Sequence, residues 1–178
     1  MSKRNNFVFT GLLIIAWIIF VGLCIEAGAL IVNFIFSLFK PEFVHNLYQK
    51  LDLSQIYNTN IWVYFGLYGF ILTISILKAY LFYVVVMLLH KIDLLKPFNS
   101  HVADQIKKIS YITLGIGIFS LIAREISQNM THYGFEIDSL NQFWKDGSAF
   151  LLMAAVIYVI ATIFSRGVEI QNENDLTV

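Results

Sequence analysis

The sequence predicts an all-α integral membrane protein, a four-helix bundle with short interfacial helices in its two outer loops. Hydrophobic residues make up 58% of the 178 residues and charged residues only 13%. A soluble domain carries about 25% charged and about 45–50% apolar residues, so this chain has too few charges to cover a surface that faces water. Four of its segments reach the ~20 apolar residues that a helix needs to cross ~30 Å of hydrocarbon. We therefore expect a single membrane domain over residues 1–178.

The four spans are predicted from apolar sequence between polar boundaries. The first is longer than a bilayer requires and contains Glu26, and the second contains Lys78. The third has a charge-free part that stops at Ala123, and the fourth contains no charge. The predicted spans are 7–39, 61–89, 109–130 and 147–165.

Short helical segments are predicted outside the spans. PEFVHNLYQKL, at 41–51, has a proline suited to a first helical turn, followed by apolar residues that would share one face in the outer interface. Those residues are Phe43, Val44, Leu47 and Leu51. SLNQFWKDG, at 139–147, indicates a similar approach to the fourth span, with Trp144 at the level of the lipid headgroups. Asn99 or Ser100 is expected to cap the third helix.

The Lys and Arg residues that flank the spans predict the orientation, because cytoplasmic loops carry an excess of them. Seven lie in the amino-terminal segment, the loop between the second and third spans, and the segment after the fourth, against three in the other two loops. The seven are Lys3, Arg4, Lys91, Lys96, Lys107, Lys108 and Arg166; the three are Lys40, Lys50 and Lys145. Both termini, including a short tail at 166–178, are therefore expected in the cytoplasm.

A buried charge cluster of Glu26, Lys78, Arg124 and Glu125 is predicted in the outer half of the membrane. An ionisable group inside a span costs ~2.5–3.5 kcal/mol on insertion scales, so such groups normally face the bundle and pair. At ~1.5 Å per residue, all four come to about 20–28 Å from the cytoplasmic boundary, and Glu26 with Lys78 is the preferred pair. Small residues beside the cluster would permit close helix contact. They are Ala27, Gly28, Ala29, Gly66, Gly69, Ala154 and Ala155.

Three interpretations of this cluster are open. It could be a structural clamp that fixes which helices are neighbours. Arg124 and Glu125 could instead extend to the outer surface of the membrane. The third interpretation is a polar pocket, open to the outside, for a proton or a small polar or amphiphilic ligand.

The sequence contains no catalytic, metal-binding or cofactor motif. Its four histidines fall in loops or at helix ends, which disfavours a haem held between helices. None of the predicted spans contains a Glu-x-x-His pair, which a di-iron site needs on its helices, and the sequence has no His-Glu-x-x-His and no glycine-rich phosphate loop. The single cysteine, Cys24, excludes an internal disulfide, and the net charge of zero does not indicate direct binding to nucleic acid. We expect a non-enzymatic protein without a metal or cofactor.

Three pieces of the chain resemble a known family. They are KPFN at 96–99, IKKISYITLGIGIFSLIA at 106–123 and, as the most specific piece, the fourth span with its ending RGVEIQNENDLTV, at 147–178. They resemble a bacterial membrane-protein family catalogued as domain of unknown function 2975, over roughly residues 60–178 and loosely in the first span. The resemblance implies a four-helix protein of the bacterial inner membrane, often encoded beside a small helix-turn-helix regulator of the Cro/repressor type. No catalytic residues are established for that family.

The function implied by this resemblance is that of a sensor or tether for the cytoplasmic regulator. Its binding surface would be the loop at 91–108 and the tail at 166–178. The charged residues expected to bind the partner are Arg166, Glu169, Glu173 and Asp175. The alternative is a ligand-binding or transport subunit that uses the charge cluster, and a third possibility is structural assembly as an oligomer or with other membrane proteins.

Overall fold

The computed structural model describes residues 3–40, 42, 44, 47–48, 51–92, 98–135 and 138–176, and its regular structure is helical, as predicted. The elements are α1 (Lys3–Phe39), α2 (Ser54–Thr59), α3 (Ile61–Lys91), α4 (Ser100–His132), the 3-10 turn η3 (Asp138–Leu140), α5 (Asn141–Trp144) and α6 (Gly147–Leu176).

The four long helices are α1, α3, α4 and α6, and each includes a segment long and apolar enough to cross a membrane. Each predicted span lies inside one of them. The prediction of a multi-pass, all-α four-helix bundle is therefore confirmed. The last helix continues past the predicted boundary at 165 and reaches Leu176, so the predicted tail is mostly helical.

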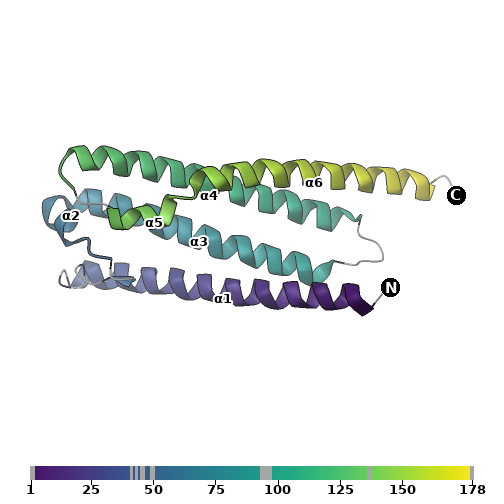
Figure 1. Cartoon of the computed structure of the whole chain (residues 1–178), viewed down its shortest axis with the longest axis horizontal. Coiled ribbons are helices and arrows are strands. Elements are labelled where there is room, and N and C mark those ends of the chain that lie inside the picture. Colours follow the sequence, from purple (N-terminus) through teal and green to yellow (C-terminus); the bar gives the residue numbers. More distant parts are fainter. Residues whose placement is uncertain are drawn as a thin grey trace.

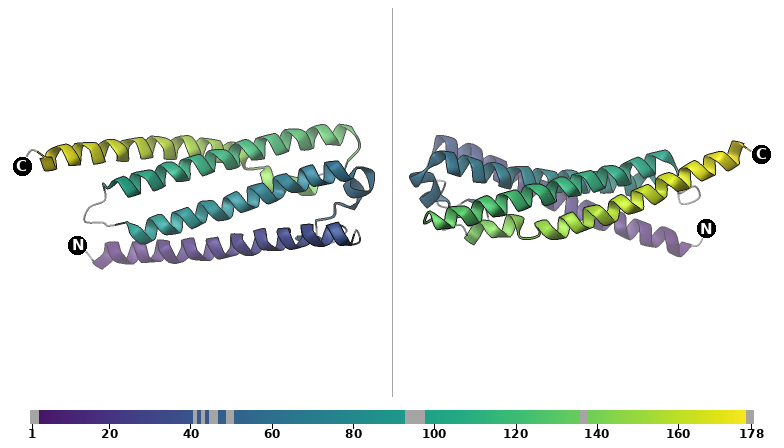
Figure 2. Two further views of the ribbon diagram at one scale, coloured as in Figure 1. Left: turned by 180° about the vertical axis from the view of Figure 1, so that it is seen from behind. Right: turned by 90° about the horizontal axis from the view of Figure 1, so that it is seen from above.

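The long helices lie side by side in chain order (Figure 1). α1 packs against α3, α3 against α4, and α4 against α6, so α1 and α6 are the outer members of the row. Figure 2 shows the same order from behind and the crossing of the helices from above. α1 begins and α6 ends at one end of the bundle, called here the terminal end. The other end, where α1 and α4 finish, is called the loop end.

Asparagine side chains mark where two of the long helices begin. The Asn60 side chain accepts a hydrogen bond from the Trp62 backbone N–H at 3.0 Å at the start of α3. The Asn99 side chain accepts one from the Val102 backbone N–H at 2.8 Å at the start of α4. These bonds satisfy amide groups that have no partner within the helix. The prediction that Asn99 or Ser100 caps the third span is confirmed, with Asn99 in that role.

The hydrophobic core is concentrated toward the loop end. Its largest fully buried side chains come from α1, the loop before α3, the first half of α3, the middle of α4 and the segment before α6. They are Trp144, Tyr64, Tyr68, Leu30, Leu51, Leu53, Ile56, Leu67, Ile71, Ile74, Ile116 and Leu140. The short helices contribute to this packing, because α2 contacts α3 and α5 contacts both α3 and α4.

Trp144, predicted at the level of the lipid headgroups, is packed inside the bundle, and only 1% of its surface is exposed. α5 turns the side chain into the space between α3 and α4 instead of toward the lipid. Among the described residues, its indole Nε1 is buried without a hydrogen-bond partner.

The first outer loop also differs from its prediction. Part of the helix expected at 41–51, including Phe43, lies outside the described residues. Leu47 and Leu51 form an antiparallel bridge in which the Leu47 N–H donates to the Leu51 carbonyl at 3.0 Å, the reverse of the helical direction. Both are buried with Val44, so these side chains pack on the bundle rather than lie in the interface. Among the described residues of this loop, the α-helix is α2, further along the chain.

Close helix contacts occur at other glycines than those predicted. A Cβ atom added at Gly28, Gly66 or Gly69 would meet nothing within 4 Å. One added at Gly117 of α4 would lie 2.7 Å from Leu151 Cδ2 of α6. The prediction holds for Ala154, which is buried at the contact between α4 and α6 and whose carbonyl accepts a hydrogen bond from Ser110 Oγ at 2.9 Å.

Candidate functional site

The four residues of the predicted charge cluster are separated in the structure. Lys78, on α3, reaches toward the start of α6, where its Nζ lies 5.8 Å from the centre of the Phe150 ring. Glu26 is half-buried on α1, and Arg124 and Glu125 are exposed on α4. None of the four is within ion-pair distance of another described residue. The preferred Glu26–Lys78 ion pair is therefore not formed, and any role of these charges stays a prediction.

Arg124 and Glu125 face outward rather than into the bundle. They line a shallow hollow on α4 together with Leu121, Ile122 and Gln128. A second hollow contains Arg124 with Lys145, a residue of the same charge. This geometry fits the extension of Arg124 and Glu125 toward the surface better than it fits a clamp or a converging polar pocket.

The predicted partner-binding residues lie along the last turns of α6. Arg166 Nη1 and Glu169 Oε2 form an ion pair at 2.7 Å, with 76% and 57% of the two side chains exposed. A pair this exposed contributes ~0–1 kcal/mol to stability, so its charges remain available to a partner. The backbone of α6 continues beside them through Glu173 to Leu176, and the side chain of Asp175 lies outside the described residues.

An aromatic ring just before α4 packs against the C-terminal half of α6. Phe98, just before α4, places its ring centre 5.2 Å from that of Phe164. A Cβ atom added at Gly167 would lie 2.6 Å from Phe98 Cδ1, so the ring occupies space that any other residue would fill. Sequence reasoning did not predict this contact, although it joins KPFN to RGVEIQNENDLTV, two of the pieces on which the family resemblance rests.

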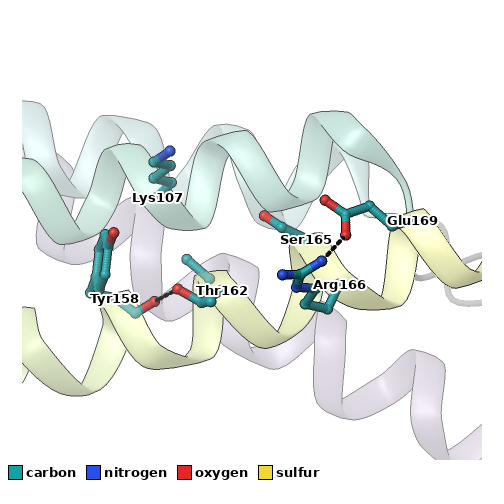
Figure 3. A pocket seen from close by; sticks show the side chains of 7 residues that line it. Lys107, Tyr158, Thr162, Ser165, Arg166 and Glu169 are labelled. Carbon is teal, nitrogen blue, oxygen red and sulfur yellow. Dashed lines mark hydrogen bonds and ion pairs between the residues drawn. The ribbon is translucent and has the colours of Figure 1, made fainter.

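A polar cavity of about 240 Å³ lies beside this contact, between α4 and α6 (Figure 3). Lys107 contributes from α4, while the other lining side chains come from α6. The lining residues are Lys107, Tyr158, Ala161, Thr162, Ser165, Arg166 and Glu169. Thr162 Oγ1 donates to the Tyr158 carbonyl at 3.0 Å. With two cations and one carboxylate, the cavity has a net charge of +1 and is suited to a small anionic group.

The described residues show no arrangement typical of a metal centre. They contain no group of three or more His, Cys, Asp or Glu side chains placed to hold an ion. The polar cavity has hydroxyl groups but no histidine to activate one as a nucleophile. Binding through charge and hydrogen bonds is the chemistry that this end of the molecule offers.

Comparison with known proteins gives a family. The family model described as protein of unknown function (DUF2975) matches residues 40–178, which include α3, α4 and α6 and leave α1 outside. The recognition made from the sequence is thereby confirmed. No curated protein and no solved structure matches the chain.

Proposed function

We propose that this chain, which belongs to the DUF2975 family, is a non-enzymatic tether of the bacterial inner membrane that binds a cytoplasmic helix-turn-helix regulator. Its binding surface is the tail helix, residues 166–176, together with Phe98, which contacts Phe164 and Gly167 at the base of the tail helix. Both termini face the cytoplasm in this proposal, because seven of the ten Lys and Arg residues outside the spans are on that side.

The observation that carries the proposal is the length and anchorage of α6. The helix continues eleven residues beyond the predicted boundary at 165, which adds about 16 Å at 1.5 Å per residue. Phe98 holds its base against Phe164 and Gly167. A helix fixed at its base presents a partner with an ordered surface, which lowers the entropy lost on binding.

The charge of the tail supports a DNA-binding partner. Residues 166–178 contain one Arg and three acids, Glu169, Glu173 and Asp175, so the net charge is 1 − 3 = −2. Proteins that bind DNA present a basic surface to the phosphates. An acidic helix complements that surface and would compete with DNA for it, so that the membrane protein holds the regulator away from its operator.

The test is co-purification from native membranes in mild detergent, with mass spectrometry of the retained proteins. The full chain is expected to retain a helix-turn-helix protein, and a chain truncated after Arg166 is expected to lose it while keeping its helical circular dichroism. The full-length Glu169→Lys variant should weaken retention, because it reverses a charge on the tail helix.

A matched control is Glu125→Lys, which makes the same charge change on an exposed site far from the tail. This variant should retain the regulator as the unmodified chain does. Retention that survives removal of the tail, or the absence of any helix-turn-helix protein from the unmodified sample, would contradict the proposal.

A further inference from the structure

A second hollow lies between α4 and α6, directly next to the polar cavity. Its volume is about 350 Å³, and most of its lining is apolar. The lining residues are Ser110, Tyr111, Leu114, Leu151, Ala154, Ala155 and Tyr158. Tyr158 lines both this hollow and the polar cavity, so the two adjoin, and together they are called the groove here.

The groove changes from apolar to polar along its length. On α6 it runs from Leu151, past Tyr158, to Arg166, and on α4 it runs from Leu114 to Lys107. The fifteen helical steps from Leu151 to Arg166 span about 22 Å. Half of the ~30 Å hydrocarbon layer plus a headgroup has a similar depth. The groove therefore has the length and polarity of a single lipid molecule in one leaflet.

Two tyrosines mark the junction between the apolar and polar parts. The rings of Tyr111, on α4, and Tyr158, on α6, have their centres 6.3 Å apart. Tyrosine is enriched where hydrocarbon gives way to headgroups. Next to this pair, Ser110 and Ala154 hold the two helices together through a hydrogen bond at 2.9 Å. The small Ala155 beside them leaves the apolar hollow open.

Two cations line the polar part, one from each helix. Lys107 belongs to α4 and Arg166 to α6 (Figure 3), and Glu169 neutralises one of the two charges. The adjacent Lys108 is directed elsewhere, with its Nζ 5.1 Å from the centre of the Tyr80 ring on α3. Of two neighbouring lysines, only Lys107 lines the cavity. The remaining charge of +1 matches the single negative charge of a phosphodiester.

We propose that this groove binds one anionic phospholipid from the leaflet at the terminal end. The phosphate lies between Lys107 and Arg166, and an acyl chain occupies the apolar hollow at Leu114, Leu151 and Ala155. This inference does not depend on the proposed tether, because the lipid is held by α4 and α6 alone and its binding is measured without any regulator.

The test uses the full-length protein in a neutral detergent, with native mass spectrometry of added lipids. The probes are phosphatidylglycerol, phosphatidylcholine with the same acyl chains, and glycerol phosphate as the free headgroup. Retention of phosphatidylglycerol alone is expected. Lys107→Gln should lower its affinity about fivefold, as the loss of one cation near a headgroup predicts. Lys108→Gln removes the same charge one residue away and should change it less than about twofold.

A variant in the apolar part tests the other half of the groove. Ala155→Phe fills the hollow without changing any charge and should lower retention of phosphatidylglycerol, with an unchanged circular dichroism spectrum. Equal binding of the two lipids, equal effects of the two lysine variants, binding of glycerol phosphate as tightly as the lipid, or full retention by Ala155→Phe would each overturn the proposal.

Discussion

The two ends of the bundle are built differently. At the loop end, buried hydroxyl groups tie the first two long helices together: Tyr64 donates to Ser37 Oγ at 2.7 Å, and Tyr68 donates to the Leu30 carbonyl at 3.0 Å. At the terminal end, a polar cavity lies between α4 and α6, and its lining includes an exposed ion pair. The largest fully buried side chains all lie outside the terminal end. The loop end therefore holds the fold together, while the terminal end is available for binding.

The largest effect is expected from Trp144→Ala. Removing a large aromatic side chain from a packed core costs about 3–5 kcal/mol of unfolding free energy. Unfolding in mixed micelles of increasing SDS content, followed by circular dichroism, measures the loss. Trp62→Ala is the matched control, because 78% of that tryptophan is exposed. Equal losses for the two variants would show that Trp144 does not pack in the core.

A smaller effect is expected from Tyr64→Phe, which removes the hydroxyl that donates to Ser37 Oγ. The expected loss of unfolding free energy is about 0.5–1.5 kcal/mol, the net value of a typical hydrogen bond. The same SDS titration applies. Tyr83→Phe deletes an exposed hydroxyl and should leave the midpoint unchanged. If the Tyr83 variant lost as much stability, the hydroxyl network would not distinguish the two ends.

The smallest effect is expected from Gly167→Ala at the terminal end. Alanine favours a helix over glycine by about 0.5–1 kcal/mol, but its Cβ would press on the Phe98 ring. We expect almost no net change in the unmodified chain and slower amide exchange of the tail helix in a Phe98→Ala background. Hydrogen exchange at residues 168–173 measures both. Equal slowing in the two backgrounds would mean that Phe98 does not restrict the base of the tail.

The spans could be predicted because they depend on local sequence. A long apolar segment between polar boundaries forms a helix in a bilayer whatever lies beside it. The cap at Asn99 is equally local, since the side chain bonds to an amide three residues away. The family could be recognised for a similar reason, because its distinctive pieces are continuous stretches of chain.

Side-chain directions could not be predicted, because they depend on how each helix is rotated about its axis. Lys78 and Glu26 have compatible heights, yet Lys78 reaches toward Phe150 on α6. Gly69 and Gly117 look alike in the sequence, but only Gly117 lies against a neighbouring helix. The contact of Phe98 with Gly167 joins residues that are far apart in the chain, so no local pattern reveals it.

The chain-order row of helices has a consequence for biosynthesis. Each long helix after α1 packs against the long helix before it, so its partner has already been made when it leaves the ribosome. Contacts between neighbours in the chain close with little loss of entropy and therefore form quickly. The bundle can grow by one helix at a time, and α6, which carries the tail helix, is added only after its support on α4 is in place.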